Sequence, residues 1–199
     1  DGIVSDDGEV VLARNADPAT DPILLLRAAA AAAQAGLTIN PFTAARLARH
    51  AAHIPSPWPL EARDALVSLL GAGSAALPVW ESLDQHHVWT ALLPHWDAVR
   101  SAPQHNPVHR FAVDRHLVET AIEASAFVRT VDRPDLLLVA ALLHDIGKGR
   151  GGDHSEVGAP LAADIAGHLG FDPADVATIE RLVRHHLLLP DTATRRDPD

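Results

Sequence analysis

The sequence lacks several residue types that would otherwise define its chemistry. There is no cysteine among its 199 residues, so disulfide bonds and thiolate metal sites are excluded and the redox compartment is left open. Aromatic residues make up only 4% of the chain although 47% of it is hydrophobic, which predicts a core built largely of leucine, valine and alanine. No initiating methionine is present, and we expect a fragment of a longer protein.

Membrane-spanning runs and signal regions are also missing. No apolar run is long enough to cross a bilayer, and residues 1–4 carry neither the basic nor the apolar part of a secretory signal. The formal net charge is −10 and the pI is near 5.6, which argues against nonspecific binding to nucleic acid or to an anionic membrane surface. We therefore expect a soluble cytoplasmic protein that binds neither.

Residue patterning predicts a mostly helical fold. Residues 3–12 form a short hairpin pattern that turns at Asp7-Gly8, and strand signals are absent after residue 12. Helical periodicity, caps and breakers mark segments 23–35, 43–53, 60–70, 77–83, 113–131, 136–146 and a helix after Asp172. The length leaves room for one ordinary domain, or for one domain with a small extension.

The stretch from Leu136 to Gly158 places a histidine and a carboxylate at the end of a helix that is apolar on all sides. His144 and Asp145 stand side by side after this run, and a glycine-rich loop then leads to His154. Burying an imidazole and a carboxylate is costly unless both find partners. A divalent cation would satisfy both, because imidazole nitrogen and carboxylate oxygen are common ligands of such ions.

Two other helices offer histidines from distant parts of the sequence. His116 falls on the apolar face of segment 113–131. In the helix that Asp172 is expected to cap, His186 lies at the edge of the apolar face and is preferred over His185 as the inward residue. A single histidine on such a face is more often a core residue bonded to a carbonyl. Three helices that each turn a histidine inward favour a metal centre instead.

The loop that follows Asp145 contains the only lysine of the chain, Lys148. A compact positive charge at this position suits a phosphate oxygen or a leaving group, and the alternative is a solvated loop lysine. The preceding glycine does not make a nucleotide-binding P-loop, because no serine or threonine follows the lysine. Asp153 is expected to cap the next helix, with Glu156 completing a capping box.

Four parts of the sequence together carry a resemblance to a known family: residues 104–116, residues 144–158 (HDIGKGRGGDHSEVG), residues 183–187 and Arg195-Arg196-Asp197. They resemble the HD superfamily of metal-dependent phosphohydrolases. More narrowly, they resemble the central HD domain of the bifunctional uridylyltransferase/uridylyl-removing enzymes that modify the nitrogen-regulatory PII protein. The resemblance implies an all-α HD-domain helical bundle over residues 101–199, preceded by a helical extension over 21–100. Residues 1–20 are then a hairpin remnant of a preceding domain or linker.

The resemblance also implies a set of site residues. One or two divalent metal ions are expected, the first held by His116, His144, Asp145 and Asp197, and the second by His154 and His186. Only the family pattern makes Asp197 a candidate metal ligand. Without that pattern, Asp197 would be assigned to a charged tail. Asp145 and Lys148 are the expected catalytic residues. Substrate contacts are expected from His109, Arg110 and Arg150, with a surface role equally open for His109 and Arg110. Segment 89–108 is expected to wrap the mouth of the site.

The implied reaction is hydrolysis that removes UMP or AMP from a modified tyrosine of its partner, the PII protein. The nucleotidyltransferase signature and the glutamine-sensing domains of the full family enzyme are missing from the sequence, so we expect neither activity. Two alternatives stay open. One is an HD phosphodiesterase that acts on free nucleotides such as an alarmone or a cyclic dinucleotide, and the other is a non-catalytic helical interaction domain.

Overall fold

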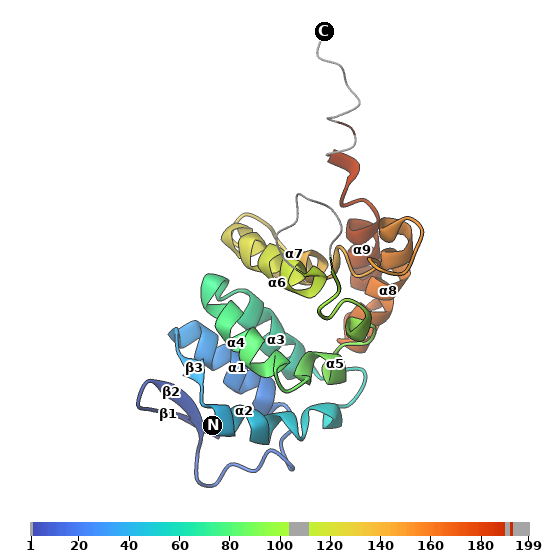
Figure 1. The fold of residues 1–199 in the computed structure, drawn as a ribbon. Coiled ribbons are helices and arrows are strands. Elements are labelled where there is room, and N and C mark those ends of the chain that lie inside the picture. Colours follow the sequence, from blue (N-terminus) through green and yellow to red (C-terminus); the bar gives the residue numbers. More distant parts are fainter. Residues whose placement is uncertain (1, 104–111, 190–191, 193–199) are drawn as a thin grey trace.

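Helices dominate the architecture, which the computed structural model describes for residues 2–103, 112–189 and 192. The prediction of a mostly helical fold is confirmed (Figure 1). The α-helices of this described part are α1 (Leu24–Ala35), α2 (Pro41–Ala48), α3 (Leu60–Leu70), α4 (Ala76–Asp84), α5 (Val88–Leu92), α6 (Val113–Ala124), α7 (Pro134–Leu143), α8 (His154–His168) and α9 (Pro173–Arg184). Its short 3-10 turns are η1 (Ala51–His53), η2 (Gly73–Ala75), η3 (Trp96–Ala98) and η4 (Ser125–Phe127).

A small sheet lies at the N-terminal end. The predicted hairpin is present as β1 (Ile3–Asp6) and β2 (Glu9–Leu12), which pair antiparallel. The expectation of no later strand is wrong, because β3 (Thr38–Ile39) pairs parallel with β2. Two residues are too few to show an alternating pattern. Val10 of β2 is buried in the same core as the helices, so the hairpin packs on the extension; its origin in a preceding domain stays a prediction.

Helices α1 to α4 pack together beside this sheet (Figure 1). Helix α1 buries three leucines and five alanines, whose small side chains allow close approach to α3. It ends at Gly36, which adopts the left-handed conformation with φ of 66°. The prediction of one helix over 43–53 is wrong, because the His50 N–H bonds to the Leu47 carbonyl and this tighter turn ends α2 before η1.

The predicted helix over 113–131 also ends early. Helix α6 stops at Ala124 and η4 adds a single 3-10 turn. The Ser125 hydroxyl bonds back to a carbonyl of the preceding turn, which competes with continued helix. Phe127 and Val131 are 59% and 40% exposed, so the apolar pattern beyond Ala124 does not mark a buried face.

Helices α7, α8 and α9 carry the C-terminal half of the core. Helix α7 has no exposed residue and packs against α3, α6 and α9, although it ends at Leu143, one turn earlier than predicted. The expected N-caps are present: Asp153 accepts from two backbone N–H groups of α8, and Asp172 does the same for α9. Glu156, expected to complete a capping box, instead pairs with Arg184 of α9.

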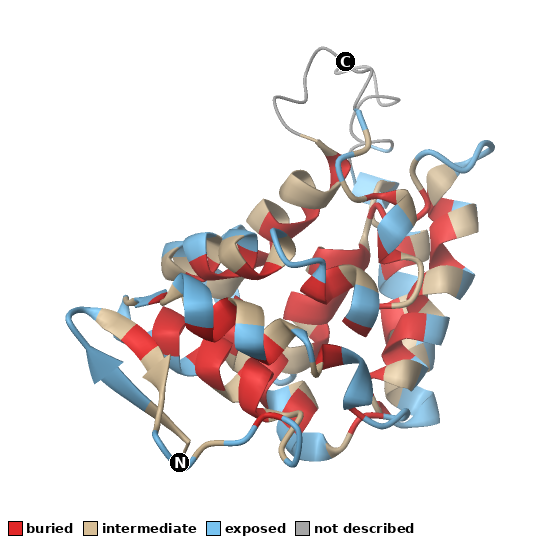
Figure 2. Cartoon of the chain, turned by 60° about the horizontal axis from the view of Figure 1, so that its bottom comes forward, coloured by how far each residue is buried: buried red, intermediate tan, exposed pale blue. Residues whose placement is uncertain are grey.

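One continuous apolar core joins the two halves of the molecule. Figure 2 shows its buried residues along the inward faces of the helices. Leucine, alanine and valine dominate it as predicted, but all four tryptophans are buried as well. Trp80 and Trp89 stack with ring centroids 3.6 Å apart, and Trp96 packs edge-on against Trp80. These rings fix α5 and η3 against α4.

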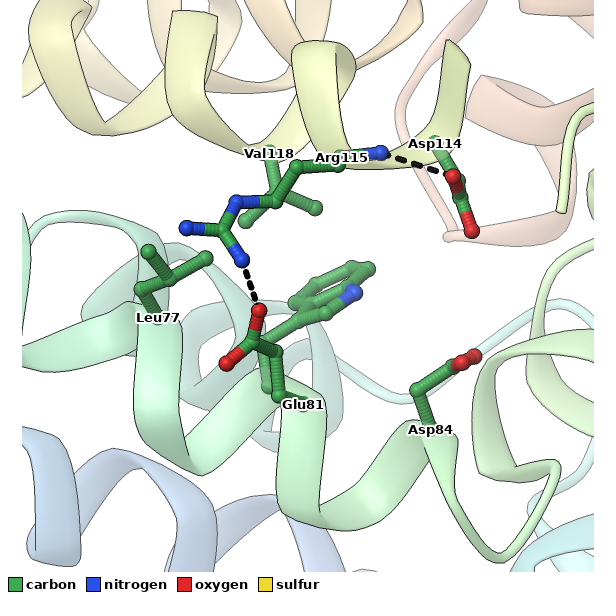
Figure 3. Close-up of a pocket in the computed structure, with 7 residues that line it drawn as sticks. Leu77, Glu81, Asp84, Asp114, Arg115 and Val118 are labelled. Carbon is green, nitrogen blue, oxygen red and sulfur yellow. Dashed lines mark hydrogen bonds and ion pairs between the residues drawn. The ribbon is translucent and has the colours of Figure 1, made fainter. Parts of the chain in front are cut away.

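Helix α6 is seated on α4 through a polar and apolar contact. Figure 3 shows Arg115 reaching from α6 to Glu81 of α4, beside Leu77 and Val118. Trp80 lines the same pocket. Arg115 also pairs with Glu119, one turn further along α6. The contact sets the position of the helix that carries His116.

Within the described residues, no single helix has the length and apolar character to span a membrane. The α3 helix and the segment Gly73–Asp84 pass that test only as a pair bent by 110°.

Candidate metal centre

Asp145 lies at the centre of the candidate site. It follows directly after α7, where His144 forms the C-cap, and it is 3% exposed. No other aspartate or glutamate in the described part of the chain is buried. A buried carboxylate requires compensation from neighbouring groups, and the surrounding side chains show what supplies it.

Four imidazoles converge on the two oxygens of this carboxylate. On Oδ2, His144 Nε2 lies at 3.2 Å and His116 Nε2 at 3.5 Å. On Oδ1, His154 Nε2 lies at 3.2 Å and His186 Nε2 at 3.5 Å. The structure therefore brings together five of the six predicted metal ligands from α6, the end of α7, the start of α8 and the segment after α9. Asp197, the sixth, lies outside the described residues, as do His109 and Arg110.

Backbone carbonyls orient two of these imidazoles. His144 Nδ1 lies 2.8 Å from the Ala141 carbonyl oxygen, and His186 Nδ1 lies 2.7 Å from that of Val183. A carbonyl oxygen only accepts hydrogen bonds, so Nδ1 must carry the proton in both rings. In the neutral ring, Nε2 then presents a lone pair toward Asp145, which is how a metal-ligating histidine is usually held.

The spacing of the donor atoms fits a metal ion. His116 Nε2, His144 Nε2 and Asp145 Oδ2 form a triangle with sides of 3.2, 3.2 and 3.5 Å. Ligands bound at about 2.0–2.2 Å lie about 2.8–3.6 Å apart at octahedral or tetrahedral angles. Asp145, His154 and His186 form a second group of mutually close donors. Each group uses a different oxygen of Asp145, and the residues of either group would be able to hold an ion.

The electrostatics of Asp145 agree with this geometry. Burial opposes its ionisation, but the imidazoles of His116, His144 and His186 outweigh burial and hold the pKa of the carboxyl well below its usual range. Its Oδ1 is buried and accepts no well-formed hydrogen bond, although two imidazole nitrogens lie close by. An ionised carboxylate surrounded by imidazole nitrogens is a donor set in which a cation can take the place of the imidazole protons.

Lys148 supplies a positive charge to the same carboxylate. Its Nζ lies 2.5 Å from Asp145 Oδ2, and its side chain is 21% exposed. The backbone N–H of Lys148 also donates to the Asp145 carbonyl at 3.0 Å, so one tight turn places both residues. The expected catalytic pair is therefore in direct contact.

Two glycines pin the Lys148 turn against α8, a role that sequence reasoning missed. A Cβ at Gly147 would lie 2.2 Å from the His154 carbonyl oxygen and 2.6 Å from the Gly158 backbone nitrogen. A Cβ at Gly158 would in turn lie 3.1 Å from the Gly147 nitrogen. Only glycine allows this approach, which brings His154 to the Asp145 loop. The sequence signal was the first and the last glycine of the motif HDIGKGRGGDHSEVG.

Arg150 lies on the outer side of the glycine-rich loop. Its guanidinium donates to the His95 carbonyl at 3.3 Å, and His95 Nε2 in turn lies 2.8 Å from Asp164 of α8. The described part of segment 89–108 therefore lies beside the loop. A role for Arg150 in binding substrate stays a prediction.

His185 belongs to neither donor group. It is exposed and forms the C-cap of α9. His185 and His186 both line a mainly apolar hollow, whose other lining residues are Thr178, Arg181 and Leu182. His186 Nε2 also lies 3.5 Å from Asp145 Oδ1, so this one residue joins the hollow to the candidate metal centre.

Comparison with known proteins identifies the class first. Residues 113–198 match the model of the HD domain family, and this range holds α6 to α9 and all five converging side chains. Residues 113–198 therefore carry an HD domain, as the motifs predicted.

The particular relatives follow from whole-chain comparison. The chain is 58% identical over all of its 199 residues to a bifunctional uridylyltransferase/uridylyl-removing enzyme of Streptomyces coelicolor. It is 51% identical over 99% of its length to the enzyme of that name from Mycobacterium tuberculosis, and 35% identical over 98% to that from Corynebacterium glutamicum. It covers 24%, 24% and 28% of these proteins, or about a quarter of their length. The chain thus corresponds to the HD region of such enzymes.

Proposed function

We propose that this chain is a metal-dependent phosphodiester hydrolase that removes a nucleotidyl group, UMP or AMP, from a modified tyrosine of the PII nitrogen-regulatory protein. The observation that carries the proposal is the Asp145 carboxylate, whose two oxygens each face a separate pair of imidazole nitrogens. The name of the relatives, uridylyl-removing enzyme, supports the class of group removed. We place the reaction in the cytoplasm.

The residues of the site would divide the work as follows. His116, His144 and Asp145 would hold one divalent ion, and Asp145, His154 and His186 a second; Asp197 is proposed as a further ligand of the first. Bound ions of this kind supply a water of lowered pKa and offset charge on phosphate oxygens.

Charge near the leaving group would come from the chain itself. Lys148 would offset the charge that develops on the phosphate, and His109, Arg110 and Arg150 are proposed contacts on the substrate side. A tyrosine phenolate has a pKa of about 10 in its free form, so it leaves with little protonation. The hollow that shares His186 would receive the part of the substrate next to the phosphate.

The test is hydrolysis of a nucleotidylated PII protein by the purified chain with added Mn²⁺ or Mg²⁺. We expect release of a nucleoside monophosphate, and its loss in His144→Ala and Asp145→Ala. His86→Ala is the matched control, because this histidine is exposed and belongs to neither donor group. If hydrolysis survives both site substitutions, the assignment of the site is wrong. Turnover of free nucleotides alone would instead identify a phosphodiesterase, and no metal-dependent turnover would leave an interaction domain.

A further inference from the structure

We propose that Lys148 serves as the internal cation of Asp145 in the metal-free protein, and that a divalent ion entering the His116, His144 and Asp145 group displaces its ammonium toward the substrate. The displacement rests on the metal centre proposed above. Lys148 would then have two positions: on Asp145 when no metal is bound, and facing the substrate phosphate when metal is bound.

The contact distances set up a competition for one oxygen. Lys148 Nζ lies 2.5 Å from Asp145 Oδ2, which is the oxygen that His116 and His144 also face. An ion bound to this oxygen at about 2.0–2.2 Å would lie within about 4.7 Å of Nζ if the ammonium stayed in place. An ammonium group has three donors and no lone pair, so it cannot become a ligand of the ion.

Burial makes coexistence of the two cations unfavourable. Asp145 is 3% exposed, and repulsion between like charges is poorly screened at a buried site. The carboxylate cannot move away, since it is fixed by the end of α7 and by the tight turn to Lys148. The lysine side chain is therefore the group that must move when an ion binds.

The local backbone lets the side chain move while its Cα stays in place. Gly147 is pinned against α8 by contacts that no Cβ would allow, which fixes the turn. The lysine stem itself is flexible over four carbons, and 21% of the side chain already reaches solvent. Displacement can thus occur by side-chain rotation alone, and it leaves the ammonium at the mouth of the site.

The resting contact also explains why the metal-free protein tolerates its buried carboxylate. Without a counter-charge, ionised Asp145 would carry a large desolvation cost. Lys148 provides that charge, beside the imidazoles that lower the pKa of Asp145, until an ion replaces it. Metal loading would then release one positive charge beside the ion, where a phosphate group carries its negative oxygens.

Because Lys148 is the only lysine of the chain, its amine can be followed without mutation. The metal-free protein is acylated briefly with an N-hydroxysuccinimide ester, and modification at Lys148 is compared with that at the α-amine of the same molecules by peptide mapping. The measurement is repeated across a Mn²⁺ titration in which bound metal is determined independently by equilibrium dialysis. We expect the relative rate at Lys148 to rise about tenfold as metal binds, because a hydrogen bond to a charged group protects the amine by at least that factor, and to fall again after chelation.

Two variants sharpen the test. Asp145→Asn removes the charged acceptor, so Lys148 should react fast with or without metal, provided circular dichroism shows unchanged helix content. Lys148→Met removes the competing cation with little change of shape, and it should bind Mn²⁺ about tenfold more tightly, by the same estimate of the ion pair. If Mn²⁺ binds while the rate at Lys148 stays constant or falls, or if Lys148→Met binds no more tightly, the displacement is refuted although the metal centre stands. If no metal binds to the wild-type chain, the metal centre itself is refuted.

Discussion

The contact between Gly147 and helix α8 gives the sharpest prediction for the fold around the site. In Gly147→Ala the new methyl group would meet the His154 carbonyl oxygen at 2.2 Å and the Gly158 nitrogen at 2.6 Å. Real Cβ atoms essentially never approach within 3.0 Å of such atoms, so the loop and α8 must separate by close to 1 Å. Both neighbours are backbone atoms, which cannot rotate out of the way as a side chain could.

Overpacking a rigid contact typically costs about 1–3 kcal/mol, and the backbone partners place this site at about 3 kcal/mol. The assay is urea unfolding followed by circular dichroism, with metal binding measured in parallel. We expect a lower free energy of unfolding and weaker metal binding, because the same separation moves His154 away from Asp145.

Gly167→Ala is the matched control for this prediction. Gly167 lies in α8, where an added methyl group would meet no atom within 4 Å, and alanine there should stabilise the helix by about 0.5–1 kcal/mol. Gly147→Ala with wild-type stability and metal affinity would show that the loop does not rest on α8 as described, and the reasoning would fail.

Three further outcomes are expected. Asp172→Ala removes the side chain that caps α9 and should lower the free energy of unfolding by about 1 kcal/mol in urea; an unchanged value would contradict the cap. Hydrogen bonds from Arg133 lower the pKa of Asp135 and outweigh the opposing effect of burial. Ionised Asp135 therefore stabilises the fold above the unfolded pKa of about 3.9, and this stabilisation is lost as pH falls through the folded pKa. The difference in free energy of unfolding between wild type and Asp135→Asn should therefore shrink as pH is lowered from 7 to 3, and a constant difference would contradict the lowered pKa of Asp135. Leu182→Glu puts a charge in the half-exposed wall of the hollow beside His186 and should raise KM for a nucleotidylated protein about tenfold with metal affinity unchanged; an unaltered KM would exclude the hollow from substrate binding.

Features with local causes were predictable from the sequence. The N-caps at Asp153 and Asp172 and the left-handed stop at Gly36 depend on neighbouring residues only. The end of α6 was missed because Phe127 and Val131 continue the apolar period although both are exposed. Strand β3 was missed because its pairing with β2 is made across 28 residues of chain and leaves no local pattern.

The candidate site also has some features that the sequence predicted and others that it did not. Helical periodicity predicted inward positions for His116 and His186, and the structure places both within 3.5 Å of Asp145. For His186 the helical premise was wrong, because α9 ends at Arg184 and His186 lies in the turn after it. Their role as metal ligands stays a prediction. No periodicity could show that Gly147 meets Gly158 or that Lys148 rests on Asp145, because both contacts depend on how the loop folds back. The positions of His109, Arg110 and Asp197 lie outside the described residues.

The centre depends on more of the chain than the matched HD region. His116 is the single converging side chain that α6 contributes, and α6 packs against α4, where Arg115 pairs with Glu81 (Figure 3). Helix α7, which ends at the site, rests on α3. A shift of α4 or α3 by one side chain's width would open the triangle of His116, His144 and Asp145, whose sides are 3.2 to 3.5 Å. Residues before the HD region therefore act on the centre through packing, because close-packed interfaces transmit displacement rather than absorb it.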